Sequence, residues 1–253
     1  MSCSLARLLV LAAVLAVAAP PAVAQNRTLV VGSSATYPPF AYETPARQIA
    51  GFDVDVIQAI AAKAGFTVRL VNTPFTGVFA ALNNGDLDLI ISGVTITDRR
   101  RQSYDFSAPY FEARQLIAVP ASSTVRTLQD LSGKKVGVVT GSTADDVASR
   151  TFGKTSPNIR RFESTPLIIS ELAGGGVDAA MGDNGVIAYR VAQNPDLKTL
   201  DDKSFPEEGF GIVVKKGDKA LLDKLTAGLA AIRADGSYAT IYKKWFTKDP
   251  NAR

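Results

Sequence analysis

Two residue types that carry much enzyme chemistry are almost missing from this chain. Its 253 residues include no histidine and a single cysteine, Cys3. Zinc sites and nucleophile–base pairs are usually built from these side chains, so both kinds of site are disfavoured. We therefore expect no metal, no cofactor and no catalytic residue. A protein without disulfides is stabilised by its core, and 46% hydrophobic residues are enough to form one.

Long apolar runs are also missing, with one exception at the N-terminus. The run at 8–19 is too short to cross a bilayer, although a membrane anchor is the alternative interpretation. Two prolines follow it, and a small-residue cleavage site ends at Ala24. Residues 1–24 are therefore predicted to be a secretory signal peptide, and the mature protein is expected in the periplasm. Cys3 precedes the run, so it is not placed to carry a lipid anchor.

A strong excess of one charge is the third absence. Lysine and arginine number 28 against 24 acidic residues, a formal net charge of +4. The only basic run is 99–101, which makes nucleic acid a poor candidate for a partner.

Apolar, β-branched runs alternate with amphipathic segments along the rest of the chain. Strands are predicted at 29–33, 66–71, 87–92, 116–119, 135–139, 159–162, 179–181 and 211–214. Helices are predicted at 53–64, 77–83, 143–151, 167–172, 183–192, 221–234 and 237–246. This alternation predicts parallel sheets covered by helices on both faces, in an α/β fold of two lobes with a cleft between them.

The helix at 53–64 has signals at both ends. We expect Asp53 to cap its first turn and Asp55 to lie favourably near the positive end of the helix dipole. Gly65 is expected to end the helix in the left-handed conformation.

Ligands of open α/β sheets bind beyond the carboxyl ends of the strands, so residues that follow strands are candidates. After 87–92, Gly93 permits close backbone approach, and Arg100 offers a planar fork that matches a carboxylate. We interpret Arg99 and Arg101 as solvent-exposed.

Two further candidates follow later strands. Thr143 enters a helix after 135–139, where N–H groups and a hydroxyl suit an anion, or where it simply caps the helix. Asp183 follows 179–181 and is either another cap or the partner of an ammonium. Tyr37 and Phe75 are either aromatic walls of a pocket or core residues. An arginine for a carboxylate and an aspartate for an amine together describe a site for an α-amino acid.

Four strings carry a resemblance to a known family. They are GFDVDV at 51–56, GVTITDRR at 93–100, YDFSAPY at 104–110 and GSYATIYKKWF at 236–246. In this order they resemble the bacterial extracellular solute-binding proteins of family 3, which bind polar amino acids, and most closely the glutamine-binding branch.

The resemblance implies a two-lobed periplasmic-binding-protein fold (type II), each lobe a sheet flanked by helices and joined by two hinge strands. Lobe 1 would comprise 26–109 and 211–253, lobe 2 would comprise 115–205, and the hinge would be 110–114 and 206–210. The function implied is the binding of a free L-amino acid by hinge closure, for an inner-membrane ABC transporter permease. We expect a monomer.

The resemblance also implies roles for individual residues. Arg100 would hold the α-carboxylate of the ligand, and Asp183 would hold its α-amino group. The other ligand-binding residues implied are Thr95, Thr143, Ser92, Gly93, Tyr37, Phe75 and Ser34.

Departures from the family pattern concern the ligand's side chain. Ser34 stands where members that bind glutamine or basic amino acids usually carry aspartate, and Val139 and Gly182 replace a lysine and a histidine of the glutamine branch. Loss of the aspartate argues against a cationic ligand, which would lack a partner in a dry cleft. A neutral polar amino acid is therefore favoured, glutamine first. Arg114 is the residue that could meet an acidic side chain, unless it simply faces solvent.

An enzyme on the same fold is the alternative. Cyclohexadienyl and arogenate dehydratases resemble these binding proteins, and they need a general acid in the cleft. Glu171 and Asp183 are the candidates for that role. A ligand-sensing receptor domain is a third interpretation.

Overall fold

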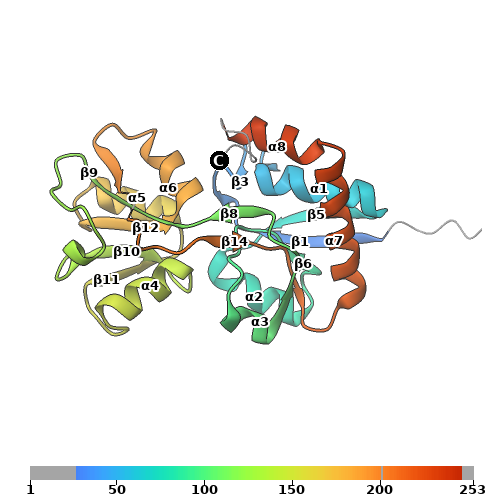
Figure 1. Ribbon diagram of the computed structural model, residues 1–253, viewed down its shortest axis with the longest axis horizontal. Helices are drawn as coiled ribbons and strands as arrows, with labels where there is room; N and C mark the ends of the chain where they lie inside the picture. The colour runs from blue at the N-terminus through green and yellow to red at the C-terminus, as the bar shows by residue number, and fades with distance from the viewer. Residues whose placement is uncertain (1–26, 201, 247–253) are drawn as a thin grey trace, which may run out of the picture.

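The molecule has two halves, each built around a five-stranded sheet (Figure 1). The structure is a computed structural model that describes residues 27–200 and 202–246. The predicted signal peptide and its cleavage site lie outside these residues. None of the helices in the described ranges combines the length and apolar character needed to span a bilayer.

The first half contains the sheet of order β5-β1-β6-β15-β7. Its strands are β1 (Thr28–Ser33), β5 (Thr67–Asn72), β6 (Leu89–Ile90), β7 (Tyr104–Phe106) and β15 (Val213–Lys215). A small second sheet is formed by β2 (Thr36–Tyr37), β3 (Ala41–Glu43) and β4 (Ile49–Ala50). The helices are α1 (Phe52–Ala64), α2 (Phe75–Asn84), α3 (Asp98–Ser103), α7 (Lys219–Ala234) and α8 (Ser237–Trp245).

The second half contains the sheet of order β11-β10-β12-β9-β13. Its strands are β9 (Gln115–Pro120), β10 (Val136–Val139), β11 (Ile159–Phe162), β12 (Ala179–Asp183) and β13 (Leu197–Leu200). The helices are the 3-10 turn η1 (Gln129–Leu131), α4 (Thr143–Phe152), α5 (Thr165–Ala173) and α6 (Asn184–Val191).

Helices cover both faces of each sheet, as the alternating pattern predicted. In the first half, side chains on one face pack with α1, α7 and α8, whereas α2 covers the opposite face. Leu89 and Ile90 illustrate the alternation, since these neighbours on β6 point into the two different clusters. In the second half, α4 covers one face, and α5 and α6 cover the other.

Two short antiparallel strands run between the halves (Figure 1). They are β8 (Phe111–Ala113) and β14 (Glu208–Phe210), and Phe111 and Phe210 are register partners. Because β15, α7 and α8 follow β14 in the chain yet belong to the first half, the chain crosses between the halves twice.

The predicted parallel sheets are only partly correct. β1 pairs in parallel with β5 and β6, and β10 with β11 and β12. β15, β7, β9 and β13, however, run antiparallel to their neighbours. The first strand after each crossing, β9 or β15, runs opposite to the rest of its sheet, whereas β7 and β13 are antiparallel only because they pair with these two strands.

The predicted cap at the start of α1 is wrong. Gly51 is the N-cap residue, and Asp53 is completely buried inside the first turn. Its carboxylate accepts hydrogen bonds from the Gly93 N–H at 3.0 Å and the Tyr110 hydroxyl at 2.9 Å. Gly65 ends the helix in the left-handed conformation, with φ of 71°, as predicted.

Candidate functional site

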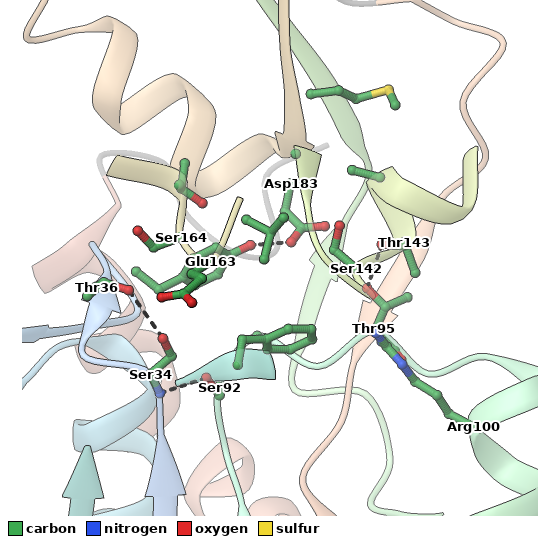
Figure 2. A pocket seen from close by; sticks show the side chains of 18 residues that line it. Ser34, Thr36, Ser92, Thr95, Arg100, Ser142, Thr143, Glu163, Ser164 and Asp183 are labelled. Carbon is green, nitrogen blue, oxygen red and sulfur yellow. Dashed lines mark hydrogen bonds between the residues drawn. The ribbon is translucent and has the colours of Figure 1, made fainter. Parts of the chain in front are cut away.

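A cavity lies where the two halves meet, and its walls come from both sheets. The space between its walls, open solvent included, amounts to about 550 Å³. Figure 2 shows the polar side chains that line it. All nine residues predicted to bind ligand line this one cavity: Ser34, Tyr37, Phe75, Ser92, Gly93, Thr95, Arg100, Thr143 and Asp183.

Arg100 is a buried cation at one end of the cavity. It lies on α3, whose N-cap Thr97 accepts a hydrogen bond from the Arg100 N–H, and only 7% of the residue is exposed. Its guanidinium donates to the carbonyl oxygens of Thr95 at 2.8 Å and of Gly141 at 3.2 Å. No carboxylate of the described residues lies within ion-pair distance of it. Buried charges are normally paired, so a guanidinium that lines this cavity is suited to receive an anion.

Asp183 is the matching buried anion. It is the last residue of β12 and the N-cap residue of α6, yet its side chain makes no cap hydrogen bond. The carboxylate instead accepts from the Tyr37 hydroxyl of the other half and from Gln115 Nε2 at 2.9 Å. Burial raises the pKa of Asp183 to about 6, partly offset by these hydrogen bonds. No cation of the described residues pairs with it, so an ammonium group in the cavity would find a charged acceptor.

The carboxylate of Glu208, close to Arg100 and Asp183, accepts hydrogen bonds from two hydroxyl groups and one amide group. Glu208, at the start of β14, accepts hydrogen bonds from Thr95 Oγ1 at 3.1 Å, Thr143 Oγ1 at 3.3 Å and Gln115 Nε2 at 3.1 Å. Thr143 is the first residue of α4, but Ser142 provides the side-chain cap by accepting from the Asp145 N–H. The capping interpretation of Thr143 is therefore wrong, and its hydroxyl belongs to a polar network that joins both halves and a linking strand.

The loop after β6 is fixed by hydrogen bonds to buried groups. Ser92 Oγ accepts from the Ser34 N–H at 2.9 Å, which joins the loops after β1 and β6. Gly93 has φ of 55°, and a side chain there would collide with the Tyr37 ring. Glycine is therefore required at this position by both conformation and space.

The aromatic residues behave as walls of the cavity. Phe75 begins α2, and the Arg100 guanidinium carbon lies 5.7 Å from its ring centre and 5.5 Å from that of Phe79. These cation–π contacts orient the guanidinium without neutralising its charge. Tyr37 stacks on Phe40 at 5.6 Å and directs its hydroxyl to Asp183.

Some polar residues in or beside the cavity were missed from the sequence, among them one glutamine and two glutamates. Glu163 follows β11 directly and lines the cavity, so the rule that ligands sit beyond strand ends could have found it. Gln115 opens β9, which runs antiparallel and so places its first residue opposite Asp183. Glu208 lies in a linking strand, and no motif marks it.

Other candidates lie elsewhere. Glu171 is exposed on α5, with its carboxylate packed against Gly176, and does not line the cavity. Arg114 is absent from the lining as well. Arg99, interpreted as solvent-exposed, forms an ion pair of 2.7 Å with Asp146 of the other half. In the described part of the chain, no three histidine, cysteine, aspartate or glutamate residues gather where they could hold a metal ion.

Comparison with known proteins agrees with this geometry. Residues 29–248 match the family model of the bacterial extracellular solute-binding proteins, family 3. The chain belongs to this family. The resemblance seen in the four sequence motifs is thereby confirmed, and so is the two-lobed fold.

Relatives of this family-3 protein differ in the ligands that their names report. A probable histidine-binding protein of Neisseria gonorrhoeae is 44% identical over 237 residues, which cover 92% of this chain and 88% of the relative. The ABC transporter glutamine-binding protein GlnH of Bacillus subtilis is 34% identical, covering 90% of this chain and 85% of the relative. The crystal structure of the arginine-, lysine-, histidine-binding protein ArtJ of Geobacillus stearothermophilus has a TM-score of 0.86 at 42% identity, covering 89% and 97% of the two chains. The chain is thus an amino acid-binding protein of a family that serves ABC transporters.

Proposed function

We propose that this protein binds one free L-α-amino acid in the cavity between its halves. Arg100 receives the α-carboxylate, and Asp183 receives the α-ammonium group. One observation carries the proposal: two buried, opposite charges line the same cavity, and neither is paired within the described residues. A zwitterion satisfies both at once, whereas a sugar would satisfy neither charge.

The remaining predicted residues complete this site. Thr95 and Thr143 offer hydroxyls near Arg100, and Ser92 and Gly93 offer backbone and side-chain groups on the neighbouring loop. Tyr37, Phe75 and Ser34 enclose the ligand's side chain. Each of these residues lines the cavity, which supports the assignment.

Binding is proposed to close the two lobes about a hinge. Lobe 1 is 26–109 with 211–253, lobe 2 is 115–205, and the chain bends at 110–114 and 206–210. Contacts across the cavity support closure, because Arg100 reaches Gly141 and Tyr37 reaches Asp183 from the opposite lobe. The closed form is favoured only by the contacts that a ligand adds to both lobes.

The biological role proposed is that of a periplasmic, monomeric binding protein that delivers its amino acid to an ABC transporter permease. An enzymatic role is not proposed, since Glu171 lies away from the cavity and Asp183 has a role as ammonium acceptor. Incubation with prephenate and with arogenate tests this directly. Formation of phenylpyruvate or phenylalanine would contradict the proposal.

A thermal-shift screen of the twenty L-amino acids tests the proposed function. A ligand at about 100 times its Kd stabilises the folded protein by about 2.7 kcal/mol, which raises Tm by several degrees. We expect at least one amino acid to produce such a shift and its D-enantiomer to produce none. No shift with any amino acid would overturn the proposal. The sequence favours glutamine, and the screen ranks it against every other side chain.

A further inference from the structure

One charged residue of the cavity has no role in holding an α-amino acid backbone. The charged side chains among the lining residues are Arg100, Asp183 and Glu163. The first two are assigned to the carboxylate and ammonium under the proposed function. Glu163 lies between β11 and α5, in the lobe opposite Ser34, and its carboxylate has no hydrogen-bond or ion-pair partner among the described residues.

Glu163 lies at the end of the cavity that is left for the ligand's side chain. Figure 2 shows it on the same side as Ser34, Thr36 and Ser164, whereas Thr95, Thr143 and Arg100 lie on the opposite side. The hydroxyls of Ser34 and Thr36 bond to each other at 3.2 Å, so this end holds neutral polar groups and one carboxylate. A ligand held by Arg100 and Asp183 therefore extends its side chain toward Glu163.

Negative charge exceeds positive charge around the cavity. Arg100 contributes one positive charge, Asp183 and Glu163 contribute two negative charges, and Glu208 adds a third beside the cavity. A ligand held by its carboxylate and ammonium groups uses the charges of Arg100 and Asp183, which leaves Glu163 as the charged lining residue at the side-chain end. A positive charge on the ligand's side chain is attracted to Glu163, by a modest amount because this carboxylate is solvent-exposed.

We propose that Glu163 selects an amino acid with a cationic side chain: arginine, lysine or protonated histidine. This inference rests on the proposed function. It also replaces the argument for glutamine, which depended on Ser34 leaving the cleft without a partner for a cation. Ser34 belongs to lobe 1, whereas the Glu163 carboxylate belongs to lobe 2. A cationic side chain bound on lobe 1 therefore meets Glu163 only when the lobes close.

Calorimetry with a matched ligand pair tests the proposal on ligand-free full-length protein. L-citrulline has nearly the shape of L-arginine without its charge, so their affinity ratio isolates the charge. We expect at least one of arginine, lysine and histidine to bind the wild type about tenfold or more tightly than glutamine. Arginine is also expected to exceed citrulline by about tenfold, a modest ratio because Glu163 is solvent-exposed.

The variant Glu163→Gln should remove that discrimination. We expect it to weaken arginine binding about tenfold, while citrulline binding changes less than about twofold. Asp223→Asn is the matched control, because it removes one exposed negative charge on α7 away from the cavity. Unchanged melting of the ligand-free variants establishes that they are folded.

The possible failures separate cleanly. If the wild type binds a neutral amino acid most tightly, or if Glu163→Gln keeps the wild-type ratio of arginine to citrulline, the role of Glu163 is overturned while the proposed function stands. If the wild type binds no amino acid, the proposed function is overturned, and this inference with it.

Discussion

The buried carboxylate of Asp53 on α1 accepts a hydrogen bond of 3.0 Å from the backbone N–H of Gly93 in the cavity wall. The same carboxylate accepts from the Tyr110 hydroxyl, one residue before β8. A residue expected to cap a helix thus joins three parts of the fold: α1, the ligand loop and the start of a linking strand. Burial raises the pKa of Asp53 to about 7, against the two hydrogen bonds, which lower it.

Replacing Asp53 separates its hydrogen bonds from its charge. Asp53→Asn keeps an acceptor for Gly93 and removes a buried charge, so we expect a small change in the free energy of unfolding. Asp53→Leu leaves the Tyr110 hydroxyl without its acceptor and the Gly93 N–H with only its bond of 3.2 Å to the Tyr110 oxygen, and we expect it to cost about 1–3 kcal/mol. Urea unfolding of both variants measures the difference. Equal stability of the two would show that the hydrogen bonds do not matter.

The main elements of the fold could be predicted because each carries a local signal. The helix at 53–64, for example, shows an apolar face and a terminal glycine, and it appears as α1 with the predicted Gly65 end. Strand direction was not predictable in the same way. The sequence of β9 is that of an ordinary buried strand and does not indicate its direction. β9 is antiparallel to β12 because of the path that the whole chain takes between the halves.

Asp183 predicts a pH dependence of binding. Burial raises its pKa to about 6, and an ammonium ligand favours the ionised form and so lowers that pKa in the complex. Affinity is therefore expected to be constant between about pH 7 and pH 8, where the ligand's ammonium is still charged, and to fall up to about tenfold per unit below about pH 6. Below about pH 6 the free Asp183 carries a proton, which ligand binding releases. Calorimetry in buffers of different ionisation enthalpy measures both effects. Asp183→Asn should bind weakly with a flat profile, and a flat wild-type profile would contradict this assignment.

Glu208 is expected to set the pH at which the binding affinity begins to fall, because it acts on the pKa of Asp183. Its negative charge raises the pKa of Asp183, so Glu208→Gln should move the midpoint of the binding profile to lower pH. The glutamine still accepts hydrogen bonds from Thr95 and Thr143, which keeps the network largely intact. A midpoint unchanged or moved to higher pH would show that Glu208 does not act on Asp183 through its charge.

The ion pair between Arg99 and Asp146 is expected to matter little. It bridges the two halves at 2.7 Å, but the side chains are 63% and 30% exposed. Exposed pairs contribute about 0–1 kcal/mol and are screened by salt. Arg99→Ala should therefore weaken ligand binding less than about fivefold, and by less still at high salt. A loss as large as that caused by removing Arg100 would contradict the different roles given to these neighbours.

The site was predictable where its residues follow parallel strands. Asp183 ends β12, Arg100 and Thr143 follow the ends of β6 and β10, and the parallel core of each sheet brings such ends to one edge. Gln115 and Glu208 were not predicted as site residues, because Gln115 belongs to an antiparallel strand and Glu208 to a linking strand. Their hydrogen bonds to Thr143 depend on how the two halves are joined, and no local sequence pattern specifies that.

The most direct test of the central claim is calorimetry of Arg100→Ala and Asp183→Asn with the amino acid that binds the wild type. Each change removes one charge of the pair that holds the zwitterion, and each should cost about 2–5 kcal/mol of binding free energy, at least a thirtyfold loss of affinity. Arg101→Ala, which removes a neighbouring exposed arginine, should bind within about twofold of the wild type. Wild-type affinity in either cavity variant would contradict the account.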